Sequence, residues 1–444
     1  MKKPVTDIET AAMRKISWRL IPFIALLYFA AFIDRVNVGF AAPQMNHALG
    51  FSPYVYGLGA GIFFLSYCLF EVPSNLVLHK VGGRLWIGRI MITWAVLAGA
   101  MALIHTPLSF YSLRFLLGAA EAGFFPGIVY YLTGWAPAAH RARLIGLFMT
   151  AIPLSTAFGA PISSFILSLN GVFGIAGWRW LFLLETVPSL ALGCATLIWL
   201  HDRPEQASWL TTEEKAWLTR TLADERANRP AHAGALVRAL INPRVLTLGV
   251  CYFGAEIGLY GVILWLPQIL QNVGVSSANI GWAIAGPYAL AAVVMVVWCR
   301  HSDRTRERVW HIAIASAVAC AGLAASACAP HSAVLSLAAI TLGVVGTLAI
   351  LPVFWTLPTA LLDGAAAAGG IALINALGNI GGFAGPFVVG WIKDRTGSYA
   401  PGLLVIAGCV LMTGIIALIL GHDSKAEYGE DVAQAAPALA AKPG

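Results

Sequence analysis

Two charged side chains, Asp34 and Arg35, lie next to each other inside the first long apolar segment of the chain. On a helix, Asp34 lies about 22 Å beyond Arg19, the last basic residue before that segment. This depth places the pair in hydrocarbon if the segment spans a membrane, where an ionised side chain costs at least about 2.5–3.5 kcal/mol. We therefore interpret the pair as the start of a pathway for a charged substrate, rather than as two charges that only neutralise each other.

Further charged residues fit the same chemistry. If the charged substrate is an anion, it needs a cationic partner in the bilayer, and the planar guanidinium of Arg35 can hold a carboxylate through two hydrogen bonds. Coupling to protons needs a carboxyl group that is neutral for part of the cycle, and Asp34 and Glu121 are the candidates. Arg114 lies seven residues before Glu121, near the same helix face. It is interpreted either as a further cation for an anion or an acid, or as an arginine that reaches the membrane interface.

Other polar residues inside apolar segments are candidates for supporting roles. Asn375 and Asn379 are spaced i, i+4 and are predicted to hydrogen-bond substrate oxygens, although buried Asn also joins membrane helices. Glu71 is predicted to hold an inner gate, and Glu185 to anchor the same inner region by pairing with loop arginines. Glu256 is either a third titrating group or a residue that faces water near the inner end.

The composition is typical of a membrane protein that crosses the bilayer many times. Hydrophobic residues make up 59% of the chain, charged residues 11%, and the mean hydropathy is +0.76. The basic residues that give the net charge of +7 are confined to short loops, so no nucleic-acid partner is expected. The seven cysteines have no paired spacing. With no phosphate-binding loop, catalytic triad or cofactor motif, we expect neither a metal nor a cofactor, and no enzymatic activity.

The apolar segments fall into two groups of six around a charged connector, a pattern typical of transporters built from internal repeats. We therefore predict an all-α membrane protein with twelve transmembrane helices in two six-helix bundles. The predicted spans are 18–41, 54–78, 86–104, 108–132, 144–168, 178–200, 245–271, 278–299, 309–329, 333–356, 368–391 and 400–421. Glycine- and proline-containing runs at 122–127, 150–161 and 378–386 are predicted to break the helices where the bundles bend.

The distribution of basic residues predicts the orientation. Of the 28 Lys and Arg residues, 23 fall on the N-terminal segment, the tail and the loops on the same side, so both termini are expected in the cytoplasm. The expected domains are an N-terminal six-helix bundle (1–200), a cytoplasmic linker (201–242), a C-terminal six-helix bundle (243–422) and a disordered cytoplasmic tail (423–444). The linker is predicted to hold a surface helix capped by Thr211 or Thr212.

Two loops at symmetric positions carry related sequences. NLVLHKVGGRLWIGR follows the second span and WCRHSDRTRERVW follows the eighth. Both resemble the loop signature of the major facilitator superfamily, in which an acidic residue and arginines tie span ends together on the inside. Asp303, Arg304 and Arg308 match the signature in the second copy. The first copy keeps Arg84 but has His79 where an acid is usual, so that latch is altered.

A finer resemblance extends over nearly the whole chain. It is carried by FIDRVNVGFA, FEVPSNLVL, RFLLGAAEAGFFPG, GWRWLFLLE, GLYGVILWLPQIL and NALGNIGGFAGPFVVGWIKDRTGS. These segments resemble the anion:cation symporter family, which includes bacterial permeases for tartrate, phthalate, hydroxyphenylacetate and sugar acids, and vesicular glutamate transporters. Members typically move organic anions with protons. The resemblance implies a proton-binding role for Glu121 and substrate contacts by Tyr67 and Trp355.

The expected function is proton-coupled symport of a small organic anion into the cell by alternating access. The anion is expected to be a carboxylate such as a hydroxy-dicarboxylate, a sugar acid or an aromatic acid. The protein is expected to act as a monomer in the lipid of a bacterial inner membrane. Two alternatives stay open, namely efflux or exchange of the same anion class, and a transporter-fold sensor that binds substrate without moving it.

Overall fold

The computed structural model describes residues 7–227, 242–329, 332–361 and 364–420, and in these ranges all regular structure is helical. The chain forms two compact units, one of Met1–Leu49 and Ile62–Pro230, the other of Gly50–Gly61 and Ala231–Gly444. Twelve helical segments of the described residues are long and apolar enough to cross a membrane, which confirms the predicted number. The tail predicted to be disordered, 423–444, lies outside the described residues.

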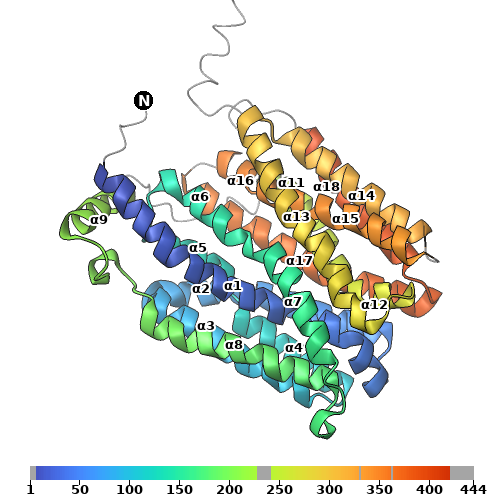
Figure 1. The fold of residues 1–444 in the computed structure, drawn as a ribbon. Helices are drawn as coiled ribbons and strands as arrows, with labels where there is room; N and C mark the ends of the chain where they lie inside the picture. Colours follow the sequence, from blue (N-terminus) through green and yellow to red (C-terminus); the bar gives the residue numbers. More distant parts are fainter. Residues whose placement is uncertain (1–6, 228–241, 330–331, 362–363, 421–444) are drawn as a thin grey trace, which may run out of the picture. The chain divides into compact units, whose positions relative to one another are not determined.

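In the first unit, α1 lies along α7 and α8, and α3 packs along α8 (Figure 1). The N-terminal turns of α2 belong to the second unit. The helices are α1 (Asp7–Leu49), α2 (Pro53–Val81), α3 (Gly83–Ala100), η1 (Met101–Leu103), α4 (Pro107–Glu121), α5 (Phe124–Thr133), α6 (Ala138–Met149), α7 (Ala151–Leu167), η2 (Val172–Gly174), α8 (Gly177–Trp199), η3 (Pro204–Gln206) and α9 (Thr212–Ala227).

Two spans of this unit are broken, both within the runs predicted to break. The fourth span stops at Glu121 and restarts as α5 three residues later, with Gly123 at a φ of 85° that glycine adopts without strain. The fifth span breaks at Thr150, between α6 and α7. Pro126 and Pro153 lie in the first turn of the restarted helices. Proline has no N–H to donate to the carbonyl four residues earlier, and its ring clashes with that carbonyl. Each break therefore falls about four residues before the proline.

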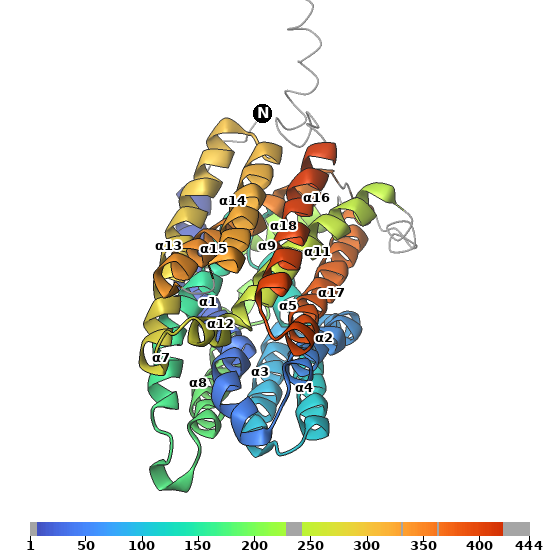
Figure 2. The same ribbon diagram turned by 90° about the vertical axis from the view of Figure 1, so that its right-hand side faces the viewer.

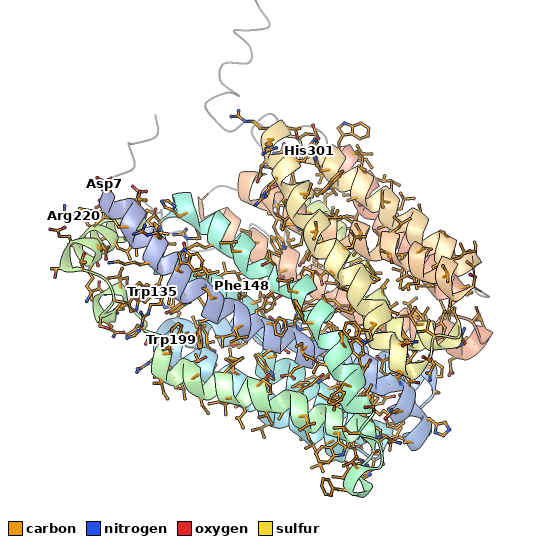
Figure 3. The ribbon with its side chains drawn as sticks, in the orientation of Figure 1. Asp7, Trp135, Phe148, Trp199, Arg220 and His301 are labelled. Atoms are coloured by element: carbon orange, nitrogen blue, oxygen red, sulfur yellow. The ribbon has the colours of Figure 1, made fainter. Side chains whose placement is uncertain are left out.

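The linker forms the predicted surface helix, α9. The backbone N–H of Glu214 donates to Thr211 Oγ1 (3.2 Å), and the backbone N–H of Thr211 donates to Glu214 Oε2 (2.8 Å). This reciprocal pair is a capping box. Lys15 of α1 donates to the same Glu214 carboxylate at 2.8 Å. These contacts hold α9 against the N-terminal turns of α1, where Asp7 and Arg220 are labelled in Figure 3.

In the second unit, α11 packs along α17, and α14 packs against α15 and α18 (Figure 2). The helices are α11 (Pro243–Ile263), α12 (Leu266–Asn272), α13 (Ser277–Thr305), α14 (Val309–Cys328), α15 (Ala333–Phe354), α16 (Thr356–Leu361), α17 (Gly364–Thr396) and α18 (Ala400–Leu420). Breaks that were not predicted separate α11 from α12 and α15 from α16. Pro267 and Pro358 stand in the first turns of the restarted helices, as in the first unit.

The break predicted at 378–386 is wrong, because α17 runs without interruption from Gly364 to Thr396. The glycines of this run serve packing instead. A Cβ on Gly378 would collide with the ring of Tyr252, and one on Gly381 with the backbone carbonyl of Phe253. Their small size lets α17 approach α11 closely, as small residues do between membrane helices.

Candidate functional site

A buried ion pair joins α1 to α4. The Arg35 Nε donates to Glu121 Oε1 at 3.0 Å, and a second guanidinium nitrogen, Nη2, donates to the same oxygen. Arg35 is 7% exposed and Glu121 1%. Asp34 and Arg35 therefore do not simply neutralise each other. Successive residues of a helix point about 100° apart, so the two side chains reach different neighbouring helices.

Aromatic rings and a second arginine surround this pair. The Arg35 guanidinium carbon lies 5.6 Å from the ring centroid of Phe63 and 5.3 Å from that of Tyr67. The Arg114 guanidinium carbon lies 4.8 Å from the Phe63 centroid, and its charge acts on Glu121. These distances suit cation–π contacts. At 1% exposure Arg114 lies in the interior, so its interpretation as an arginine that reaches the interface is wrong.

Asp34 lies among neutral hydrogen-bond donors. Its Oδ2 accepts hydrogen bonds from the Trp94 indole N–H of α3 (2.9 Å) and from the Ser189 hydroxyl of α8 (2.5 Å). Its Oδ1 has no hydrogen-bond partner among the described residues, and the side chain is 2% exposed. The sequence offers no signal for either donor, because neutral residues inside apolar segments look like ordinary packing residues.

The predicted pairing of Glu185 with a loop arginine is wrong, because no arginine pairs with it among the described residues. Glu185 lies eight residues into α8, is 6% exposed, and accepts a hydrogen bond from Ser163 of α7 at 2.6 Å. The Asn37 side chain of α1 lies near the Glu185 carboxyl group, but its Nδ2 makes no hydrogen bond to it. The prediction fails because Glu185 lies too deep in its span for a loop side chain to reach. Of its two polar neighbours, only Asn37, three residues after Asp34, could have been noticed in the sequence.

The two candidate residues of α2, Tyr67 and Glu71, lie next to the Arg35–Glu121 ion pair. Tyr67 is 4% exposed and faces Arg35, so the structure brings Arg35, Tyr67 and Glu121 together. Glu71, one turn further, is 7% exposed, and its charge acts on Tyr67. Its role at a gate stays a prediction.

The second unit has a polar cluster of its own. Tyr252 of α11 stacks on Phe354 (ring centroids 5.0 Å apart) and contacts the ring of Trp355 (4.9 Å), and Glu256 lies one turn further along α11. Trp355 lies at the break between α15 and α16. Glu256 is 5% exposed, so the expectation that it faces water is wrong, whereas a titrating role stays open.

The two asparagines of α17 lie beside this cluster. Gly378, between Asn375 and Asn379 in sequence, packs against Tyr252, and a Cβ there would lie 3.2 Å from Glu256 Cγ. Both asparagines are half-buried. Their predicted substrate contacts, and that of Trp355, stay predictions.

The two signature loops differ as their sequences suggest. In the second copy, Arg308 pairs with Asp303 at 2.7 Å and donates to the Ser302 hydroxyl at 2.8 Å, while Arg304 is exposed. In the first copy the acid comes from elsewhere in the chain, because Asp202 Oδ1 accepts the backbone N–H of Arg84 at 2.8 Å. Sequence reasoning missed Asp202, the first acidic residue after the sixth span.

Arginines and carboxylates buried inside apolar spans are typical of proteins that move ions or charged substrates across a membrane. Residues 24–386 match the Major Facilitator Superfamily, and the chain belongs to that family. It is therefore a multi-pass membrane transporter and not an enzyme.

Relatives refine this assignment. A putative tartrate transporter of Agrobacterium vitis is 52% identical over 94% of this chain and 93% of its own length. A quinolone resistance transporter of Acinetobacter baumannii is 40% identical over 92% of this chain and 94% of its own. The xylose transporter XylE from E. coli shares the fold, with a TM-score of 0.73 and 13% identity over 93% of this chain and 99% of that chain.

Proposed function

We propose that this transporter carries a small organic anion into a bacterial cell together with protons, by alternating access across the inner membrane. A hydroxy-dicarboxylate is the first candidate substrate, because the relative that shares 52% identity is named for tartrate. Sugar acids and aromatic acids are the next candidates, on the resemblance to the anion:cation symporter family. The positive-inside distribution supports cytoplasmic termini.

The observation that carries this proposal is the buried Arg35–Glu121 ion pair. A substrate carboxylate and the Glu121 carboxylate compete for one guanidinium. A proton on Glu121 removes its charge and releases Arg35, which then binds the anion by a two-pronged contact. Phe63 and Tyr67 keep the guanidinium in place during the exchange. Because the proton promotes anion binding, the anion promotes proton binding equally, which is the requirement for symport.

Other residues complete the proposal. Asp34 is the second proton-coupling carboxyl group. Trp355, Asn375 and Asn379 are the proposed substrate contacts of the second unit. The proposed gating residues are Glu71, Arg84, Asp303, Arg304 and Arg308.

Transport in liposomes that contain the purified protein tests the proposal. Labelled tartrate should exchange with unlabelled tartrate inside the vesicles, and it should accumulate when the interior is made alkaline. A protonophore should abolish accumulation and leave exchange intact. If no hydroxy, sugar or aromatic acid exchanges, the substrate class is wrong. If exchange occurs but a pH gradient drives no accumulation, proton coupling is wrong.

A second candidate function is efflux, which the relative named for quinolone resistance favours. The same liposomes test it when they are loaded with a quinolone. Proton-driven quinolone movement without organic-acid exchange would favour efflux over uptake of an organic anion.

A further inference from the structure

A second acidic pair lies in the first unit, away from Arg35. Asp34 and Glu185 come from neighbouring helices, α1 and α8, and Ser189, which donates to Asp34, lies one turn after Glu185 on α8. Both side chains are more than nine-tenths buried. Among the described residues, neither has a basic side chain as an ion-pair partner.

Among the described residues, the groups that face this pair are neutral, with one exception. Trp94 of α3 and Ser189 of α8 donate to Asp34, Ser163 of α7 donates to Glu185, and Asn37 of α1 contacts Glu185. The exception is Glu121 of α4, whose negative charge also acts on Asp34.

Three polar atoms of the cluster make no hydrogen bond to any described residue. They are Asp34 Oδ1, Glu185 Oε2 and Asn37 Nδ2. Buried polar atoms without partners are costly, and two buried carboxylates that repel each other cost more. A proton bound by one carboxyl removes the repulsion and converts one of the orphaned oxygens from an acceptor into a donor.

The hydrogen bonds indicate which carboxyl takes the proton. Asp34 Oδ2 accepts two hydrogen bonds, from the Ser189 hydroxyl and the Trp94 indole N–H, and hydrogen bonds to a carboxylate favour its charged form. Glu185 accepts one formed hydrogen bond. Asp34 is therefore the better stabilised anion of the two, and Glu185 is the better proton holder.

We infer that Asp34 and Glu185 form one proton-binding unit that always retains at least one proton, held by Glu185 whenever Asp34 is ionised. This assigns Glu185 to proton binding instead of gating. The inference rests on the proposed function only in making Asp34 the carboxyl that exchanges its proton during transport. The retained proton itself is a property of the protein without substrate.

Infrared spectroscopy of the purified, substrate-free transporter tests the retained proton. At mildly alkaline pH, the C=O stretch of a protonated carboxyl should persist in the wild type and should lose intensity in Glu185→Gln. The matched control Glu213→Gln changes an exposed glutamate of α9 and should leave the spectrum unchanged. An unchanged band in a folded Glu185→Gln protein would overturn the inference, because Glu185 would then be ionised.

A second variant keeps the inference testable if Glu185→Gln does not fold. Ser163→Ala retains Glu185 but removes the hydroxyl that donates to Oε1, so the same band should move in frequency without disappearing. A band that does not move would overturn the inference. Sodium titration at constant pH is the last measurement: no change is expected, and a sodium-dependent loss of the band would show that the unit binds a metal ion instead of a proton. None of these readouts requires transport, so they stay interpretable if symport proves wrong.

Discussion

The guanidinium group of Arg35 contacts an acidic group and two aromatic rings at once, and this combination depends on its planar shape. The Glu121 oxygen accepts from two of its nitrogens, while Phe63 and Tyr67 contact the guanidinium. A lysine ammonium at the same position carries the charge but lacks the fork and the flat face.

Replacement of Arg35 by lysine should therefore weaken substrate binding. We expect Arg35→Lys to raise the Kd for the transported anion at least tenfold, or about 1.4 kcal/mol. Calorimetry on the purified variant measures this loss directly. The matched control Arg300→Lys, at an exposed position, should bind normally. Near-normal binding by Arg35→Lys would refute a two-pronged contact.

Competition for Arg35 predicts how pH acts on binding. In the wild type the anion should bind more tightly as pH falls, because protonation of Glu121 releases the guanidinium. Glu121→Gln imitates the protonated state, so it should bind the anion at all pH values with little pH dependence. In liposomes it should still exchange labelled for unlabelled substrate but should not accumulate it under a pH gradient.

Two results would contradict this coupling. One is accumulation by Glu121→Gln when pH is the sole driving force. The other is a binding curve for this variant that depends on pH as the wild-type curve does.

Asp34→Asn should lose accumulation in the same way, since it removes the second carboxyl.

Single residues are predictable from sequence where charge stands out in an apolar segment, and their partners are not. Asp34, Arg35 and Glu121 were all visible in this way. The packing of the helices decides which of these residues meet. It brings Arg35 to Glu121, and it brings Asp34 near Glu185. Trp94, Ser163 and Ser189 are common residues of membrane helices, so nothing in their type marks them as partners.

Helices show a similar division between what sequence predicts and what packing decides. The glycine- and proline-rich runs near Gly123 and Thr150 break their spans, whereas the run around Gly381 does not. Proline at the third residue of a restarted helix accompanies the break in α5, α7 and α16, yet Pro73 and Pro386 lie inside continuous helices. Whether a glycine bends a helix or admits a neighbour depends on tertiary contacts.

The surface helix α9 offers a pH test at the scale of an element. Burial opposes the ionisation of Glu214, but the hydrogen bonds from Lys15 and Thr211 outweigh it and lower the pKa of this carboxyl. A carboxyl whose folded-state pKa is lowered stabilises the fold above its unfolded pKa, and this stability is lost as pH falls through the folded pKa. We therefore expect α9 to detach from α1 in acid.

Limited proteolysis measures this detachment. Glu214→Gln should be cleaved in α9 faster than the wild type at neutral pH, and its cleavage rate should respond less to acid. Because Lys15 is partly exposed, the ion pair contributes about 0.5–1 kcal/mol, or a few-fold in cleavage rate. Glu213→Gln, one residue away and exposed, is the control. Equal cleavage of both variants would show that the pair does not hold α9.

At the scale of the whole molecule, the sequence was most informative. Lipid allows only backbone structures that satisfy their own hydrogen bonds, so long apolar segments predict helices with little ambiguity. The twelve segments follow from that constraint, whereas the family resemblance rests on the sequences of the two signature loops and of particular spans. The division of α2 between the two units could not be predicted, because the sequence of a continuous helix gives no signal of where its contacts pass from one unit to the other.

The helix breaks have a consequence for amide hydrogen exchange. Each restarted helix begins with N–H groups that have no partner within that helix. Deuterium should therefore enter the backbone at residues 123–125 and 356–357 faster than at 378–385 of the unbroken α17, although all three stretches lie within spans. Mass spectrometry of peptic fragments resolves these stretches. Equal protection of the three would mean that the interrupted spans are as closed to solvent exchange as continuous helices.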